Sequence, residues 1–290
     1  MSQQTSTSTS ATEHDARVNG IQLHYATWGD QAAAGRAIVL VHGITMNWTE
    51  WEVLGPTLAA AGWYVIAPDL RGRGQSEKPP HGYGIPYHAN DVLSLCDTLN
   101  LARVAVMGHS LGAFITLFLA ALHPTRVSHA ILVDAGGTVP ADALETVASS
   151  VQRIGVVYPS LEAFMEARRK SAAAFAWSPL WERLYRYDVD VWPDGTATAR
   201  MPKHALDEEV AVNAFVRLDA MLQHIKAPTL ITRATVGTLA PDRGFILTAE
   251  EAARLHDTIP GAQVVEIANV THYDIALADE FMRVVADFLG

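Results

Sequence analysis

A serine between glycines gives the clearest chemical signal in this sequence. Ser110 is the centre of the pentapeptide GHSLG at residues 108–112. The apolar run 104–107 before it is typical of a buried strand, and the apolar stretch 113–122 after it is typical of a helix. A tight turn between a strand and a helix needs such small residues, and it lifts the serine hydroxyl above the sheet. We therefore interpret Ser110 as a nucleophile, with a serine that merely caps the helix as the alternative.

A serine hydroxyl becomes nucleophilic only beside a base. His272 follows the last predicted strand, 263–268, and precedes the last predicted helix, 276–289. Of the twelve histidines it alone is placed late and at the edge where strands end, so we expect it to be the base. His109 adjoins Ser110, but neighbours on such a turn point apart, and we expect it to be a packing residue. The histidines do not pair at metal-ligand spacing, so we predict no metal site.

An acyl-transfer reaction also needs two backbone N–H groups for the developing oxyanion. One candidate donor is Leu111, directly after the predicted nucleophile. The other is Ile44, in the HGIT loop that follows the apolar run 37–41. Gly43 would let this loop turn back toward the serine. For His42 we prefer a structural role to a catalytic one, although His42 and Gly43 both count as candidate substrate-binding residues.

The remaining pattern describes the elements that must position these residues. Short apolar runs of the kind found in strands buried on both faces lie at 37–41, 64–67, 104–107 and 130–133, and two further strands are predicted at 229–232 and 263–268. Helical patterns separate them, which predicts an α/β fold with a mostly parallel sheet flanked by helices. Residues 138–216 contain no such run, look helical and are rich in aromatic residues. We expect them to form an inserted helical cap over the carboxyl ends of the strands, where ligands bind in open α/β sheets.

Composition limits the cellular context and the partners. The 290 residues carry a net charge of −10, which argues against nucleic acid and anionic membranes as partners. The single cysteine excludes a disulfide within the chain, and neither a signal peptide nor an apolar run of about 20 residues is evident. We expect a cytoplasmic enzyme with a small-molecule substrate. The expected domains are a disordered tail (1–13), a core (14–137 and 217–290) and the cap (138–216), and a homodimer stays open.

Together these motifs resemble the α/β-hydrolase superfamily. The resemblance rests on the HG loop, the stretch 69–76 (DLRGRGQS), GHSLG, the helical insertion and the late histidine, and it runs from about Val18 to the C-terminus. It implies the α/β-hydrolase fold with an eight-stranded sheet, cofactor-free chemistry, and a triad in the order nucleophile, acid, histidine. In this family, Asp69 and Arg71 would fix loops by charge-assisted hydrogen bonds.

The sequence departs from most of these relatives at the acid. After the strand at 228–232, where relatives carry the acid, no carboxylate appears until Asp242. Asp134 lies directly after the strand 130–133, which is the other position that the superfamily uses. We predict Asp134 as the acid that orients His272 and keep Asp242 as the alternative.

A closer resemblance concerns the substrate. The opening 18–25 (VNGIQLHY), the HGIT loop, the RGRG stretch and the missing later acid resemble N-formylmaleamate deformylases, which hydrolyse a small N-formyl amide bearing a carboxylate. This implies a serine hydrolase of a small amide or ester, such as a deformylase or amidase of aromatic or N-heterocycle catabolism, acting through an acyl-enzyme on Ser110. A C–C bond hydrolase of the meta-cleavage type, a cofactor-free dioxygenase and a ligand-binding receptor are the alternatives. A haloalkane dehalogenase would need aspartate at position 110.

The cap offers further candidates for substrate contacts. Among its aromatic residues we take Trp177 and Trp181 as candidate substrate-binding residues. Arg168, Arg169 and Arg183 carry the charge that a substrate carboxylate would need. Since arginines are mostly solvated at protein surfaces, we expect these three to be surface residues instead.

Overall fold

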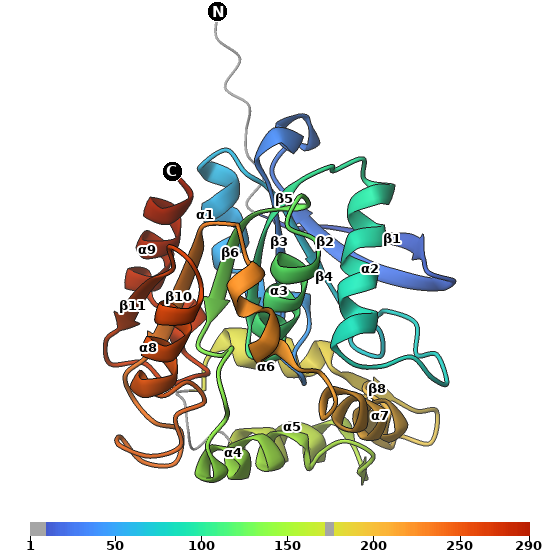
Figure 1. Cartoon of the computed structure of the whole chain (residues 1–290). Coiled ribbons are helices and arrows are strands. Elements are labelled where there is room, and N and C mark those ends of the chain that lie inside the picture. The colour runs from blue at the N-terminus through green and yellow to red at the C-terminus, as the bar shows by residue number, and fades with distance from the viewer. Residues whose placement is uncertain (1–9, 172–176) are drawn as a thin grey trace, which may run out of the picture.

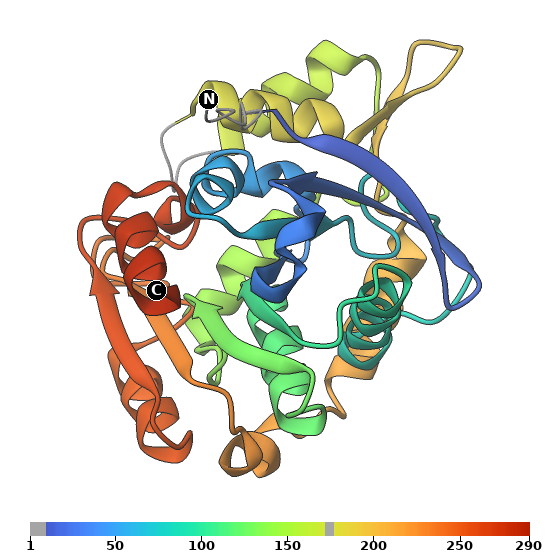
Figure 2. The same cartoon turned by 90° about the horizontal axis from the view of Figure 1, so that it is seen from above.

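The computed structural model describes residues 10–171 and 177–290. An eight-stranded sheet runs through the molecule, with helices on both of its faces (Figures 1 and 2). Its spatial order is β1-β2-β4-β3-β5-β6-β10-β11. The strands are β1 (Thr12–Val18), β2 (Ile21–Trp28), β3 (Ala37–Val41), β4 (Tyr64–Pro68), β5 (Val104–His109), β6 (Val127–Val133), β10 (Thr229–Ala234) and β11 (Gln263–Ile267). The β1–β2 and β2–β4 pairs are antiparallel and the remaining pairs are parallel, as the predicted α/β-hydrolase fold requires.

The apolar strands are buried on both faces because helices cover each side. Along β3, Val39 and Val41 belong to one core cluster, while Ile38 and Leu40 belong to the other. The first cluster lies under α2 (Ile85–Thr98), α3 (Leu111–Leu122) and α8 (Ala249–Thr258), and the second under α1 (Leu54–Ala60) and α9 (Asp279–Leu289). The short 3-10 helices are η1 (Gln31–Arg36), η2 (Trp48–Trp51), η3 (Leu218–His224) and η4 (Ile275–Leu277). None of the helices in the described ranges is long and apolar enough to cross a membrane.

The stretch predicted as a purely helical cap also contains a small sheet. Its helices are α4 (Ala141–Val151), α5 (Leu161–Ser171), α6 (Pro179–Tyr187) and α7 (Lys203–Asn213), and α4, α5 and α7 lie together at the lower side of the molecule (Figure 1). Three antiparallel strands accompany them: β7 (Val157–Tyr158), β8 (Val189–Val191) and β9 (Ala197–Ala199). Strands of two or three residues are too short to give a period-2 pattern, so the sequence did not reveal them.

Buried charges join this stretch to the rest of the chain. Arg73 forms an ion pair with Glu209 of α7, and neither side chain is exposed. Glu209 also contacts His88 of α2 at 3.0 Å. Such buried pairs fix one arrangement, because removing either partner leaves an unpaired charge in the interior.

The amino-terminal prediction needs a correction. Residues 1–9 of the predicted tail, 1–13, lie outside the described residues. Thr12 and Glu13 are not part of a tail, because they pair with Thr27 and Ala26 as the first residues of β1. The low apolar content of this strand hid it, since β1 is an edge strand with mostly exposed side chains.

Candidate active site

The turn around Ser110 has a backbone conformation that few residues other than glycine adopt. Ser110 has φ 55° and ψ −118° and stands between β5 and α3. A Cβ atom at Gly108 would lie 1.9 Å from the carbonyl oxygen of Gly112. A Cβ atom at Gly112 would lie 2.0 Å from the carbonyl oxygen of Val41. The two glycines are therefore required by close backbone approach, and the packing around them holds the serine in a strained conformation.

Asp134 and His272 form a buried hydrogen-bonded pair. His272 Nδ1 lies 2.8 Å from Asp134 Oδ2, and the residues are 6% and 2% exposed. The other carboxylate oxygen of Asp134 accepts the N–H of Ala234 at 2.7 Å. A carboxylate at Nδ1 requires the proton there, which leaves Nε2 of the neutral ring free to accept a proton. His272 and Ser110 line the same narrow cavity.

The alternative acid is not at this site. Asp242 is exposed, in the loop where Ala240 and Arg243 form an isolated β-bridge. Within the described ranges, no hydrogen bond or ion pair joins Asp242 to His272. The structure thus brings Asp134, and not Asp242, to the histidine.

A second buried histidine lies against the first. The rings of His109 and His272 have centroids 4.4 Å apart, and His109 Nε2 donates to the carbonyl oxygen of His272 at 2.9 Å. His109 Nδ1 forms an ion pair with Glu50 at 2.5 Å. Burial lowers the pKa of His109, but the Glu50 carboxylate more than offsets this, so its pKa is raised overall. The sequence did not predict a role for Glu50, because no local pattern connects it to His109, 59 positions further along the chain.

The charged neighbour affects the predicted base. Burial lowers the pKa of His272, and the positive charge of His109 lowers it further, against the opposing effect of Asp134. The net direction is downward from the usual histidine value. His272 therefore stays neutral, and able to accept a proton, at a lower pH than an ordinary histidine.

The two candidate oxyanion donors border the same space as the serine. Ile44 and Leu111 line an apolar cavity together with Ser110. Neither N–H donates to another group within the part of the chain that the structure describes. Leu111 begins α3, so its N–H is among those that a helix leaves unpaired. Arg73 Nε donates to the carbonyl oxygen of Ile44 at 3.1 Å, which fixes the orientation of the loop.

Among the candidate substrate-binding residues, Gly43 borders the site and His42 does not. A Cβ atom at Gly43 would lie 3.3 Å from Ser110 Cβ, so glycine allows the close approach of this loop. His42 is fully buried; its Nδ1 lies 2.7 Å from the Gly43 carbonyl oxygen, and its Nε2 accepts the N–H of Leu70 at 3.0 Å. Burial lowers the pKa of His42 to about 4. The geometry therefore does not support a role for His42 in substrate binding, because both of its ring nitrogens have partners inside the protein.

Trp177 and Trp181 do not line the cavities beside Ser110. Trp177 stacks on Tyr185 with ring centroids 5.6 Å apart, and Trp181 packs on the same ring at 6.1 Å. Their prediction as substrate-binding residues is therefore not supported by the geometry. Aromatic residues in a cap must also pack against one another, and sequence does not distinguish the two uses.

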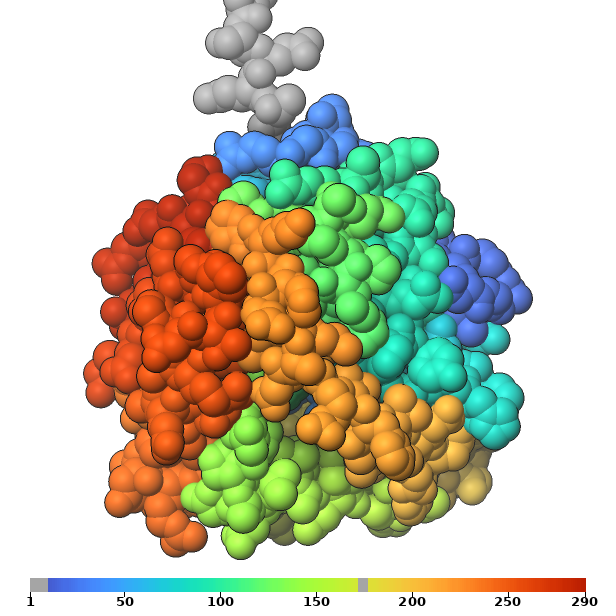
Figure 3. Space-filling view, in the orientation of Figure 1, coloured from blue at the N-terminus to red at the C-terminus, as the bar shows by residue number. Residues whose placement is uncertain are grey.

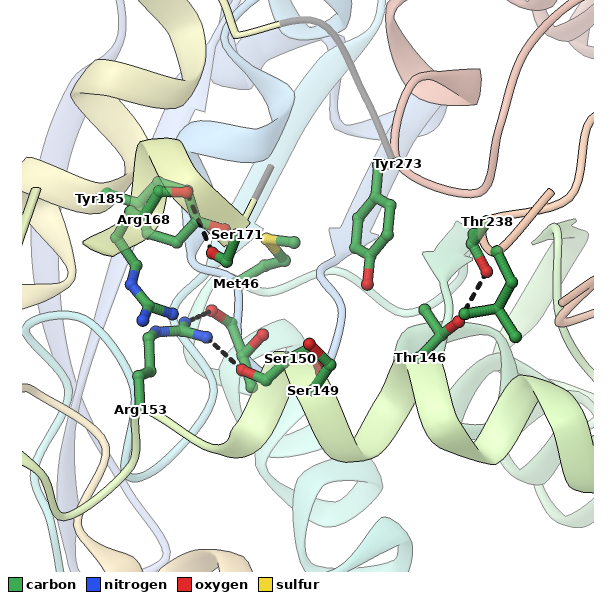
Figure 4. A pocket seen from close by; sticks show the side chains of 12 residues that line it. Met46, Thr146, Ser149, Ser150, Arg153, Arg168, Ser171, Tyr185, Thr238 and Tyr273 are labelled. Atoms are coloured by element: carbon green, nitrogen blue, oxygen red, sulfur yellow. Dashed lines mark hydrogen bonds between the residues drawn. The ribbon is translucent and has the colours of Figure 1, made fainter. Parts of the chain in front are cut away.

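Three connected cavities surround the serine. An apolar cavity of about 340 Å³ adjoins Ser110 and opens to the surface in the hollow where the green and orange segments meet (Figure 3). A narrow cavity of about 30 Å³ lies between Ser110 and His272. A polar cavity of about 160 Å³ continues from it under the cap (Figure 4). Within the described residues, no group of three or more His, Cys, Asp and Glu could hold a metal ion.

Comparison with known proteins shows a family relationship. The family model described as alpha/beta hydrolase fold matches residues 36–279. A protein named soluble epoxide hydrolase, from Corynebacterium sp. (strain C12), is 39% identical over 127 residues, which cover 44% of this chain and 43% of that protein. The chain thus matches less than half the length of this relative.

Solved structures share the fold over nearly the whole chain. An E-2-(acetamidomethylene)succinate hydrolase superposes with a TM-score of 0.81 at 21% identity, over 97% of this chain and 99% of the other. The enol-lactonase from Burkholderia xenovorans LB400 superposes with a TM-score of 0.73 at 25% identity, over 95% and 99% of the two chains. Since the family model covers most of the sequence and these structures share its architecture, the chain belongs to the α/β hydrolase fold family.

Proposed function

We propose that this protein is a cofactor-independent serine hydrolase that cleaves a small amide or ester through an acyl-enzyme on Ser110. His272 is the base and Asp134 is the acid of the triad. One observation carries the proposal: the strained Ser110 borders one cavity with His272, whose Nδ1 is hydrogen-bonded to the buried Asp134. This is the geometry that acyl transfer by a serine nucleophile needs.

The mechanism follows from the positions of these groups. Ser110 attacks the substrate carbonyl while Nε2 of His272 takes the hydroxyl proton. The N–H groups of Ile44 and Leu111 stabilise the oxyanion, and Asp134 stabilises the imidazolium. His272 then protonates the leaving group, and water activated by the same histidine releases the acyl group. The low pKa of His272 keeps the base neutral between these steps.

The size of the site and two relatives favour a small carbonyl substrate. The cavity between Ser110 and His272 is narrow, about 30 Å³, which suits a compact acyl group better than a bulky one. One structural relative is named for the hydrolysis of an acetamido compound, and another is an enol-lactonase. Amide and ester cleavage, including deformylation, therefore lead the proposal.

A substrate panel tests the proposal against its alternatives. We would assay p-nitrophenyl acetate, N-formylglycine, a vinylogous diketone and styrene oxide with the full chain and with Ser110→Ala, while recording oxygen uptake. The proposal predicts ester or amide hydrolysis that the Ser110→Ala variant loses. Cleavage of the diketone in preference to both would favour a C–C bond hydrolase. Oxygen uptake that survives in Ser110→Ala would favour a dioxygenase, and hydration of the epoxide alone would overturn the acyl-enzyme mechanism.

A further inference from the structure

The polar cavity beyond the narrow cavity contains a buried arginine without an acidic partner. We propose that this cavity is a subsite for a carboxylate group of the substrate, which Arg168 binds. The inference rests on the proposed function, because it names the class of substrate that reaches Ser110. It assigns a carboxylate-bearing amide or ester to the site.

The polar cavity lies directly beside the space at the catalytic groups. It shares five lining residues with the narrow cavity between Ser110 and His272: Thr45, Met46, Thr146, Ser150 and Tyr273. A small ligand can therefore span both cavities, with its carbonyl at Ser110 and its charged end under the cap. Figure 4 shows Arg168 and Arg153 at one end of the polar cavity and Thr146 with Thr238 at the other.

Arg153 is occupied by the protein itself. Its Nε and Nη2 donate to Asp188 at 3.2 and 2.8 Å, and its Nη2 also donates to the carbonyl oxygen of Thr45 at 2.7 Å. Its Nη1 donates to the carbonyl oxygen of Ser150 at 2.6 Å. Asp188 thus binds the edge of the guanidinium formed by Nε and Nη2 and balances its charge. Arg153 therefore fixes the cap on the loop beside the serine, and it has little capacity left for a ligand.

Arg168 differs from Arg153 in its partners. It is 8% exposed, and its Nη2 donates to the hydroxyl of Tyr158 at 3.2 Å. Its Nε is buried without a hydrogen-bond partner, and no carboxylate of the described residues forms an ion pair with it. The expectation that this arginine is a solvated surface residue is wrong. It is a buried cation that the protein leaves available on the wall of a cavity.

The charges around the cavity leave one positive charge uncompensated. Of the two arginines on the cavity wall, Arg153 pairs with Asp188 and Arg168 pairs with no carboxylate of the described residues, and the twelve residues that line the cavity include no acidic side chain. Burial, and then the charge of Arg153, lower the pKa of Arg168, in keeping with a cation that has no acidic partner. A buried unpaired cation is unfavourable, and a bound anion would relieve it.

A carboxylate fits this environment better than a phosphate group does. One uncompensated charge matches a monoanion, and the planar guanidinium can bind both carboxylate oxygens. Phosphate sites gather backbone N–H groups at helix N-termini, whereas Arg168 lies in the last turn of α5. That helix end offers Arg168 partial negative charge, which is the competing structural explanation of its position. The experiment below separates the two.

The chain offers a matched control on the same helix. Arg169 follows Arg168 directly, but its side chain is 42% exposed and it pairs with Glu182 at 2.9 Å. The expectation of a surface residue holds for Arg169. Arg168→Met and Arg169→Met therefore remove the same charge from the same helix, one inside the cavity and one outside it.

The test measures binding without requiring catalysis. In the Ser110→Ala background we would titrate the full chain with succinate, with its neutral analogue succinamide and with inorganic phosphate, by calorimetry. We expect succinate to bind, succinamide to bind far more weakly, and Arg168→Met to weaken succinate binding by about tenfold or more. In Arg169→Met the Kd for succinate should stay within about twofold of that of the parent protein. If Arg168→Met does not fold, as judged by circular dichroism, Arg168→Lys should show an intermediate loss, since the charge stays and the fork is removed.

Three outcomes would overturn the subsite: no binding of succinate, equal binding in Arg168→Met, or tighter binding of phosphate than of succinate. The two proposals fail separately. Succinate binding without any serine-dependent hydrolysis would keep the subsite and reject the acyl-enzyme mechanism. Serine-dependent hydrolysis of neutral esters without succinate binding would keep the mechanism and reject the subsite.

Discussion

The carboxylate of Asp134 accepts a hydrogen bond from His272 Nδ1 at 2.8 Å, although 138 residues separate them in the chain. Asp134 follows β6, and His272 follows β11. Strand β10 lies between these two strands in the sheet and donates the N–H of Ala234 to the same carboxylate. The parallel sheet therefore brings both loops to one edge. Among the aspartates of the described ranges, Asp134 alone has a positive φ, of 50°.

Exchange of the acid should affect the reaction far more than the fold. In Asp134→Asn the amide no longer selects the Nδ1–H form of His272 or stabilises its imidazolium. We expect kcat to fall by roughly 10³- to 10⁴-fold. Steady-state kinetics with the best substrate of the panel measures this. Asp242→Asn is the control, and its kcat should stay within about twofold of that of the unchanged protein, because Asp242 is exposed. A larger loss of kcat in Asp242→Asn than in Asp134→Asn would reject the assignment of Asp134.

The Glu50–His109 pair predicts a change in pH dependence. His272 is active in its neutral form, so the acid limb of kcat/KM follows its pKa. Glu50→Gln removes the charge that keeps His109 protonated, while an amide oxygen can still accept the Gly43 N–H. Loss of the positive charge of His109 raises the pKa of His272, whereas loss of the Glu50 carboxylate lowers it by a smaller amount, so the acid limb should move to higher pH. The profile of kcat/KM against pH measures this shift.

The control for that profile is Glu52→Gln. Glu52 pairs with Arg183 in the outer part of the molecule, where the Arg183 side chain is 53% exposed. Its exchange should leave the acid limb where it is. An acid limb that stays in place in Glu50→Gln, or moves to lower pH, would show that His109 does not carry the charge that acts on His272.

The tight turn predicts a large cost for a single methyl group. In Gly112→Ala the new Cβ would lie 2.0 Å from the carbonyl oxygen of Val41. Only a movement of the backbone can relieve this clash. We expect the free energy of unfolding to fall by about 3 kcal/mol or more. Gly35→Ala is the control, because a Cβ there meets nothing within 4 Å, and it should change stability by less than about 0.5 kcal/mol. Denaturant unfolding of both variants is decisive, and equal midpoints would contradict the packing argument.

The buried contact of Arg73 with Glu209 predicts a second stability effect. Burial raises the pKa of Glu209, but Arg73 and His88 more than offset it, so the pKa lies well below the usual glutamate value. The contribution of ionised Glu209 to the free energy of unfolding is therefore present above the usual carboxyl pKa, and it is lost as the pH falls below that pKa toward the lowered value. Glu209→Gln should lower the unfolding free energy by about 3–5 kcal/mol at neutral pH.

Asp207→Asn provides the comparison for Glu209→Gln. Asp207 lies on the same helix, pairs with Lys203, and has a side chain that is 58% exposed. Its exchange should change stability by less than about 1 kcal/mol. If Glu209→Gln were equally mild, the buried contact would not hold α7 to the core.

The sequence predicted most of what depends on local pattern. Buried parallel strands are short apolar runs in the sequence, and the glycines on either side of Ser110 form a recognisable local motif, so both could be predicted from the sequence. The order of the strands then brings Asp134 to His272. Asp134 was the preferred acid from its place after a strand, but its contact with the histidine required the structure.

What the sequence did not predict depends on packing between distant segments. Glu50 reaches His109 from η2, and no periodic pattern connects them. Arg168 and Arg169 are neighbours of one type on one helix, and only the packing of the cap decides which of them is buried. The same limit explains why the sequence suggested substrate contacts for His42, Trp177 and Trp181, which the structure shows packed against other parts of the protein.

Intact-mass spectrometry after treatment with a fluorophosphonate tests the acyl-enzyme on Ser110 most directly. The reagent reacts with activated serines, and it needs no knowledge of the substrate. Native protein should gain one adduct, peptide mapping should place it on Ser110, and Ser110→Ala should gain none. Folded native protein that gains no adduct, or an adduct that persists in Ser110→Ala, would contradict the proposal that Ser110 is the nucleophile.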